Sequence, residues 1–315
     1  MSNPPIVITD AMISESLSKM NVLEAMRVLF TQLGNGQAVQ PPQTLTEFPT
    51  GGDFITYMGA LADSSVFGAK LSPYLPREGG PIITAWTMLM SMESGQPLAL
   101  VDAGRLTTER TAATTALAVD ELAPRSKPLT LAIIGSGAVA QAHLRHVAGL
   151  RDWSEVRVFS PNLADNAATQ ESWRALQSDA VFSGSAKEAV TGADVVMLCT
   201  SSGMPVIDQA DLAPQALVTS ISTNVARAHE VDPAFLSKAQ VYCDYRATTP
   251  GSAGDMLIAA ETHGWSADQI AGDLGGLCTD QCPRPDGVRP VYFRSIGLGL
   301  EDIAVAKAVY DSQTS

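Results

Sequence analysis

The sequence predicts an α/β protein with two domains, and three observations lead to this fold class. An apolar strand pattern runs into a glycine turn and then a helix pattern at 129–149. After this unit, strand and helix patterns alternate up to residue 290, which is typical of a parallel sheet with right-handed crossovers. Before it, residues 1–124 show helix and mostly antiparallel strand patterns. We therefore expect a Rossmann domain over 125–290 and an α+β domain over 1–124, completed by the C-terminal segment 291–315.

The glycine turn has the form of a dinucleotide site. Gly135 permits a tight turn, Gly137 has no Cβ to block a pyrophosphate, and Ala140 lets the helix pack close to its strand. The helix N-terminus then offers free N–H groups to the phosphates. GxGxxA alone is a weak pattern, and the strand before it and the helix after it favour a cofactor site over a plain turn. The cofactor-binding residues expected here are Gly135, Ser136, Gly137, Ala138 and Val139.

Two later segments bear on how a cofactor is held. The second strand of such a domain usually ends in an acidic residue for NAD or a basic one for NADP. Here it ends in Ser160-Pro161-Asn162, which carries neither charge. Ser160 and Asn162 can hydrogen-bond either ribose form, so the cofactor is NAD or NADP. Thr200 and Ser201 follow the fourth strand, where the nicotinamide half is expected; the alternative is a strand-ending turn.

The first 124 residues carry their own helix and strand signals. Residues 14–33 show apolar residues at helical spacing before a glycine stop, which predicts one amphipathic helix. The alanine-rich segment 106–122 predicts a second helix, with Thr107 or Thr108 as its N-cap. Pro124 and Pro128 then place the domain boundary. Strands are expected at 44–48, 54–58, 66–71, 82–92 and 98–101 in the first domain, and at 155–159, 180–182, 195–199, 217–220 and 240–243 in the second.

Composition narrows the class of protein. The chain has 315 residues, 45% of them hydrophobic, which is enough for large buried cores. Its net charge of −13 argues against nucleic acid and anionic membranes as partners. No apolar run has transmembrane length, and the first residues lack the pattern of a signal peptide. We expect a cytoplasmic enzyme.

The four cysteines do not suggest a disulfide framework. Cys199 and Cys243 stand in strand patterns, where they are expected as small buried hydrophobic residues. Cys278 and Cys282 form CTDQC in a polar loop, and none of the four histidines is close to them in sequence. An incidental loop pair is favoured over a zinc site, and no metal is expected.

Three more segments stand in a fixed order around GSGAVAQAHL: FGAKLSPYLP, RLTTERTAATTALA and VYFRSIGLGLEDIAVAKAVY. This ordered set resembles the ornithine cyclodeaminase and mu-crystallin family over nearly the whole chain. That family includes ornithine cyclodeaminase, NAD-dependent alanine dehydrogenase and cyclic ketimine reductases. The resemblance implies a homodimer whose first domain, completed by the C-terminal helix, supplies the substrate contacts and the dimer sheet.

The resemblance also implies roles for single residues. It places Lys70 beside the substrate and Arg110 on the substrate's α-carboxylate. A guanidinium forks two hydrogen bonds onto a carboxylate, and a desolvated lysine exchanges protons near neutral pH. Without the family set, the ordinary alternatives are favoured: Lys70 as a surface lysine on a strand edge, and Arg110 as a solvated helix residue or half of a structural ion pair. Ser295 and Gly297 match a segment near the nicotinamide carboxamide, and Asp302 is expected only to cap the last helix.

Three positions depart from the cyclodeaminase pattern. Gln43 stands where the family often has a second carboxylate-binding arginine, and Thr56 stands where the cyclodeaminase has a glutamate for a distal ammonium. Asn224, six residues ahead of Glu230, stands at the cyclodeaminase aspartate. An amide cannot accept a proton at physiological pH, so Asn224 orients the substrate but is no general base. The expected catalytic residues are Lys70 and Asn224, and the expected substrate-binding residues are Arg110, Gln43, Thr56 and Met58.

These substitutions rank the candidate functions. We expect an NAD(P)-dependent oxidoreductase acting at the α-carbon of an amino or imino acid, with a small cyclic ketimine as the first choice of substrate. Ornithine cyclodeaminase, a lyase that forms proline and ammonia, ranks second. A crystallin-like protein that binds NAD(P)H without catalysis is the third candidate.

Overall fold

The computed structural model describes residues 4–17, 20–125, 128–223 and 227–314. The chain forms two compact units, of which unit 1 comprises Met1–Arg110 and Gly297–Ser315 and unit 2 comprises Thr111–Ile296. The helix α3 (Gly104–Leu122) carries the chain from the first unit into the second. The predicted boundary after residue 124 follows the end of this helix, whereas the two compact units divide inside it.

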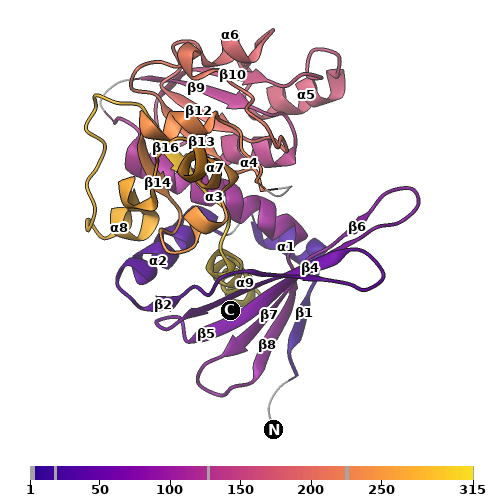
Figure 1. Cartoon of the computed structure of the whole chain (residues 1–315). Helices are drawn as coiled ribbons and strands as arrows, with labels where there is room; N and C mark the ends of the chain where they lie inside the picture. The colour runs from indigo at the N-terminus through magenta and orange to yellow at the C-terminus, as the bar shows by residue number, and fades with distance from the viewer. Residues whose placement is uncertain (1–3, 18–19, 126–127, 224–226, 315) are drawn as a thin grey trace. The chain divides into compact units, whose positions relative to one another are not determined.

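Unit 1 is an α+β unit built on a mixed sheet (Figure 1). Its strands are β1 (Ile6–Ile8), β2 (Ala38–Val39), β3 (Thr44–Glu47), β4 (Asp53–Leu61), β5 (Val66–Leu75), β6 (Ile82–Ile83), β7 (Trp86–Ser91) and β8 (Pro97–Asp102). Their order is β1-β8-β7-β5-β4-β2, with β3 paired to β4 and β6 paired to β5. Only the β1–β8 pairing is parallel among the pairings that the structure describes in this sheet.

Besides the first turns of α3, the described residues of unit 1 form the helices α1 (Asp10–Leu17), α2 (Val22–Gly34) and α9 (Gly299–Thr314). The last of these packs closely on one face of the sheet, because β4 and β5 carry glycine where it passes. A Cβ on Gly59 would lie 2.9 Å from the Leu300 side chain, and one on Gly68 would lie 2.9 Å from Ile303. This close approach brings the first turn of α9 to the middle of the sheet.

Unit 2 is a Rossmann domain, as predicted. Every pairing described in its sheet is parallel, and the strand order is β11-β10-β9-β12-β13-β16-β14-β15. The strands are β9 (Leu129–Ile134), β10 (Trp153–Phe159), β11 (Val181–Phe182), β12 (Val195–Leu198), β13 (Leu217–Ser220), β14 (Gln240–Cys243), β15 (Ile270–Asp273) and β16 (Val291–Arg294). The helices are α4 (Ala138–Val147), α5 (Ala167–Leu176), α6 (Ala186–Val190), α7 (Gly254–Thr262) and α8 (Leu274–Cys278).

Four local predictions were wrong. The strand expected over 82–92 is two strands, β6 and β7. The helix expected over 14–33 is two helices, because Asn21 accepts a hydrogen bond from the Glu24 amide and caps a new helix. The helix α3 begins at Gly104, whose amide donates to Asp102 Oδ1 at 2.9 Å, and Thr107 therefore lies inside the helix and does not cap it. Residues 291–294 do not complete the first domain. They form β16, which lies between β13 and β14 in the sheet of unit 2.

Candidate active site

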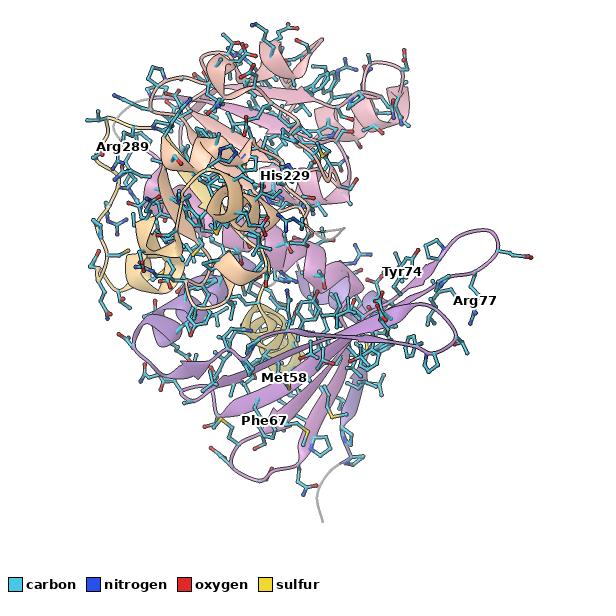
Figure 2. All side chains as sticks on the ribbon, viewed as in Figure 1. Met58, Phe67, Tyr74, Arg77, His229 and Arg289 are labelled. Atoms are coloured by element: carbon cyan, nitrogen blue, oxygen red, sulfur yellow. The ribbon has the colours of Figure 1, made fainter. Side chains whose placement is uncertain are left out.

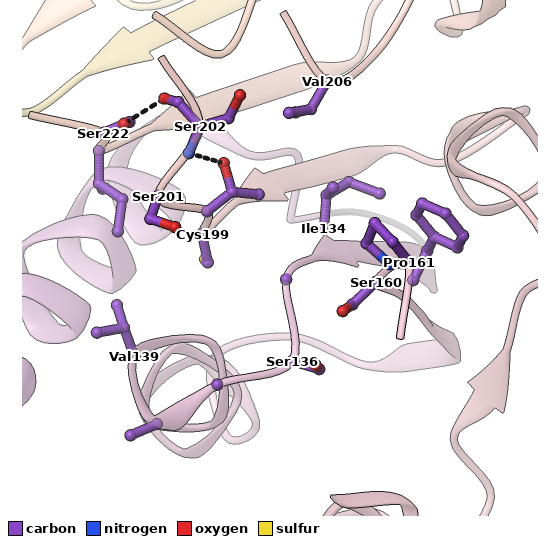
Figure 3. Close-up of a pocket in the computed structure, with 16 residues that line it drawn as sticks. Ile134, Ser136, Val139, Ser160, Pro161, Cys199, Ser201, Ser202, Val206 and Ser222 are labelled. Atoms are coloured by element: carbon purple, nitrogen blue, oxygen red, sulfur yellow. Dashed lines mark hydrogen bonds between the residues drawn. The ribbon is translucent and has the colours of Figure 1, made fainter. Parts of the chain in front are cut away.

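A cavity of about 790 Å³ opens in unit 2 where four parallel strands end (Figure 3). The glycine turn after β9 forms one wall, and the loops after β10, β12 and β13 form the others. In a doubly wound sheet, this carboxyl edge is where ligands bind. The lining residues are 134–139, 159–161, 199–202, Val206, Ile221 and Ser222.

The glycine turn fits the pyrophosphate of a dinucleotide. Gly135 has φ +119°, and a Cβ there would lie 2.4 Å from the carbonyl oxygen of Cys199, so this position requires glycine. A Cβ on Gly137 would meet no atom of the described residues within 4 Å, because it would point into the open cavity. Gly137 is also the N-cap of α4, and it has no side chain to occupy the first N–H groups of the helix. Those N–H groups would hold the phosphates.

Hydrogen bonds from two neighbouring elements fix the glycine turn. The Gly135 amide donates to the carbonyl oxygen of Phe159 at the end of β10. The indole of Trp173 on α5 is fully buried and donates to the carbonyl oxygen of Ser136 at 3.1 Å. The turn therefore keeps the geometry that a nucleotide needs before any ligand arrives.

The predicted cofactor residues outside the turn divide into two groups. Ser160, Thr200 and Ser201 line the cavity, together with Ser202 and Ser222, whose hydrogen bonds Figure 3 shows. The other three, Asn162, Ser295 and Gly297, are not among the lining residues. The Ser295 hydroxyl donates to the buried carboxylate of Asp244 at 3.0 Å, and Gly297 lies against Arg110 in unit 1.

Unit 1 contains a buried cluster of four charged side chains. The Lys70 ammonium on β5 is 2.9 Å from Asp302, and the Arg110 guanidinium on α3 is 3.2 Å from the same carboxylate. Arg110 also donates through Nη1 to Glu301 at 2.9 Å. Both acids belong to the first turn of α9, whose N-terminus favours negative charge. We call Lys70, Arg110, Glu301 and Asp302 the charge cluster, and their formal charges cancel.

The environment of the charge cluster changes the proton affinity of its two cations. Burial lowers the pKa of Lys70, and Asp302 only partly offsets that effect. Burial also opposes the charge of Arg110, but Asp302 and Glu301 outweigh it and raise the pKa of this guanidinium. Arg110 thus stays charged at any physiological pH, whereas the Lys70 ammonium becomes a better proton donor.

The strand register decides which residues share the face of Lys70. Tyr57 on β4 pairs directly with Lys70 on β5, and the Lys70 ammonium lies 4.3 Å from the centre of the Tyr57 ring. Successive side chains in a strand point to opposite faces. Thr56 and Met58, both predicted to bind substrate, therefore lie on the opposite face, and the Met58 side chain is exposed (Figure 2).

The other two residues predicted to contact the substrate are Gln43 and Asn224. Gln43 lies half-buried between β2 and β3, and its Oε1 has no hydrogen-bond partner within the part of the chain that the structure describes. Asn224 lies outside the described residues. The charge cluster thus contains Lys70 and Arg110 from the predicted set, and neither Thr56 nor Met58.

Sequence reasoning missed Tyr57, Glu301 and the role of Asp302. Asp302 was expected only to cap the last helix, but it pairs with both Lys70 and Arg110. The available signal was the pair Glu301-Asp302 inside an otherwise apolar segment, GLGLEDIAVA, because adjacent acids in a buried helix need cationic partners.

The remaining predictions from the sequence concern metals, cysteines and membranes. Cys199 and Cys243 are buried and free, as predicted for small hydrophobic residues. Over the described ranges, no group of three or more His, Cys, Asp or Glu side chains is arranged to hold a metal ion. None of the helices found in those ranges combines the length and the apolar character that crossing a bilayer would need.

Comparison with known proteins gives matches over nearly the full length. The model of the ornithine cyclodeaminase/mu-crystallin family matches residues 5–315. The NAD(P)H-dependent anabolic L-arginine dehydrogenase DauB of Pseudomonas aeruginosa is 58% identical, covering 97% of this chain and 96% of its own. The ketimine reductase mu-crystallin of Rattus norvegicus is 28% identical, covering 93% and 91%. The structure of Thermococcus litoralis Δ1-pyrroline-2-carboxylate reductase, in complex with NADH and L-proline, matches with a TM-score of 0.89 at 23% identity, covering 98% and 97%.

The two glycines of the turn should respond differently to alanine. Gly137→Ala should leave the free energy of unfolding nearly unchanged, since a Cβ there meets no described atom within 4 Å, but should weaken NADH binding roughly tenfold or more by filling the pyrophosphate site. Gly135→Ala should instead destabilise the fold by about 1–2 kcal/mol or more, because of its positive φ and the contact with Cys199. Urea unfolding and nucleotide titration measure both effects. Normal NADH affinity in the folded Gly137→Ala variant would contradict the assignment.

Proposed function

The chain belongs to the ornithine cyclodeaminase/mu-crystallin family, and from that premise we propose that it is an NAD(P)(H)-dependent oxidoreductase acting at the α-carbon of an amino or imino acid. The observation that carries the proposal is the charge cluster, which combines a permanently charged guanidinium with a lysine of lowered pKa. A carboxylate anchor and a proton donor are the two groups that imine reduction requires of a protein. The cavity of unit 2 supplies the cofactor site, for NAD or NADP.

L-arginine and its α-imino acid are the first substrates to consider. The support is the L-arginine dehydrogenase DauB, which is 58% identical over nearly the full length of both chains. A small cyclic ketimine, ranked first from the sequence, stays a second candidate, because the ketimine reductase mu-crystallin is also a full-length relative. Cyclodeamination ranks below both, because Asn224 offers no general base.

Arg110 is the proposed anchor for the substrate's α-carboxylate. Asp302 and Glu301 accept from its Nε and Nη1 and so fix the plane of the guanidinium. Gly297 lets the backbone pack directly against the guanidinium, since a Cβ there would lie 2.3 Å from Nη1 and 3.1 Å from Nη2. We expect the carboxylate to bind along this Nη1–Nη2 edge, where two parallel hydrogen bonds fix the orientation of the α-carbon.

Lys70 is the proposed proton donor. In the reductive direction the α-nitrogen must carry a proton while Cα gains a hydride, and a bound nicotinamide ring supplies that hydride. The proton comes from the Lys70 ammonium, and the resulting neutral amine is tolerated because burial already lowers the pKa of this group. Asp302 holds the ammonium in place through its ion pair, and Tyr57 covers it from β4. Oxidation of the amine runs the same proton transfer in reverse.

The substrate can be identified with purified protein. L-arginine with NAD+ or NADP+ should give a rise in absorbance at the wavelength of the reduced nicotinamide, and the 2-oxo acid of arginine with ammonia should reverse it. L-ornithine and Δ1-pyrroline-2-carboxylate serve as matched alternatives. Release of proline and ammonia from ornithine with catalytic NAD+ would contradict the ranking, and the absence of turnover with all of these substrates would contradict the oxidoreductase proposal.

We also propose that the enzyme is a homodimer formed through the face of the unit 1 sheet opposite to Lys70. This face exposes Val7, Met58, Phe67, Leu71 and Met88, an apolar set of the kind that marks an interface. Light scattering should therefore give twice the mass of the chain, and Met88→Asp should shift the distribution toward monomer. A monomeric wild-type protein at micromolar concentration would contradict this proposal. A cytoplasmic location stays a prediction.

A further inference from the structure

Glu230 is a buried acid in unit 2 that the proposed chemistry does not use. Its side chain is fully buried, and its carboxylate accepts five hydrogen bonds. One oxygen accepts from the amide and the hydroxyl of Thr200, at 2.8 and 2.7 Å. The other accepts from the Ser220 hydroxyl at 2.8 Å and from the amides of Ile221 and Ser222 at 3.0 and 3.1 Å. Each oxygen thus serves a different loop.

These two loops are walls of the nucleotide cavity. Thr200 follows β12, Ile221 and Ser222 follow β13, and all three residues line the cavity. The Glu230 backbone adds a second contact to the loop after β12, because its carbonyl oxygen accepts from the amide of Val206 at 2.9 Å. The loops also bond each other, since the Ser222 hydroxyl donates to the carbonyl oxygen of Ser202 at 2.6 Å (Figure 3).

The strand order shows which half of a dinucleotide these loops would meet. The glycine turn follows β9, the strands β10 and β11 lie on one side of it, and β12 and β13 lie on the other. In a Rossmann sheet the two nucleotide halves lie on opposite sides of that strand. Ser160 after β10 belongs to the adenosine side, so the loops after β12 and β13 belong to the nicotinamide side.

We propose that Glu230 is a positioning residue that shapes the nicotinamide end of the cavity by tying together the loops after β12 and β13. The inference rests on the proposed NAD(P)(H) function and adds a residue to it. A carboxylate suits this position because all five of its partners are donors and an ionised carboxylate only accepts. A glutamine of the same shape would turn an NH₂ group toward N–H or O–H donors, and one loop would lose its anchor.

The test compares two nucleotides that differ only at the nicotinamide end. NADH and ADP-ribose share the adenosine and pyrophosphate, but ADP-ribose has no nicotinamide ring. Glu230→Gln should weaken NADH binding by roughly tenfold or more and leave ADP-ribose binding within about twofold of the wild type. Glu230→Asp, which keeps the charge, should recover part of the NADH affinity. Fluorescence titration or calorimetry measures both constants without any turnover.

Two further variants keep the result interpretable. The Asp273 carboxylate in unit 2 also accepts hydrogen bonds from two backbone amides, those of Gly276 and Arg246, but it is not part of the cavity lining. Asp273→Asn should therefore leave the affinities for NADH and ADP-ribose unchanged. Ser220→Ala removes one donor to Glu230 without touching the cavity lining, and it should weaken NADH binding several-fold. This variant decides the question if the glutamine variant does not fold. Its value is that it tests the same link by a milder change.

Several outcomes would overturn the proposal. The first is a folded Glu230→Gln variant that loses affinity for NADH and for ADP-ribose equally. The second is an unchanged NADH affinity in that variant or in Ser220→Ala. The third is an Asp273→Asn variant that weakens NADH binding as much as Glu230→Gln does. Wild-type protein that binds neither nucleotide would also do so. If the wild type binds NADH but oxidises no amino acid, the proposed reaction fails, while the nucleotide comparison still decides the role of Glu230.

Discussion

The ion pairs inside the charge cluster are the constraint on which unit 1 depends. Lys70 and Arg110 are buried, and an unpaired buried charge costs several kcal/mol, so both cations need the carboxylates at the start of α9. Asp302 lies 232 residues from Lys70 along the chain, so the pair joins the C-terminal helix to the sheet laid down near the N-terminus. The same pairs set the two properties that the proposed chemistry uses, a fixed guanidinium plane and a lysine with a lowered pKa.

Unit 2 also buries a charged side chain, but here the charge is negative. Glu230 is fully buried, and donors from the loops around the cavity satisfy it, whereas the charge cluster of unit 1 satisfies itself. Groups held in this way do not have to reorganise when a ligand arrives, which is the usual source of electrostatic advantage in enzymes. Both units therefore use buried charges to hold neighbouring groups in place: the two cations of the charge cluster in unit 1 and the cavity loops in unit 2.

The sequence predicted the Rossmann domain well because its signals are local. The glycine turn, the strand before it and the helix after it are contiguous, and the structure bears out the steric reason for Gly135. The partners of Arg110 were missed because they lie 191 and 192 residues away, where no helical spacing connects them. Thr56 and Met58 were chosen over Tyr57 because a shift of one residue in register moves every side chain of a strand to the other face.

The pH dependence of kcat for imine reduction in Asp302→Asn tests the central claim most directly. Burial lowers the pKa of Lys70 and Asp302 raises it, so kcat should fall as the pH rises through that pKa. Removing the Asp302 charge should move this fall in kcat, the alkaline limb of the pH profile, to lower pH. Glu301→Gln should move it less, because Glu301 has a smaller effect on the pKa of Lys70. An unmoved limb in folded Asp302→Asn, or an equal shift in Glu301→Gln, would contradict the role of Lys70 as the proton donor.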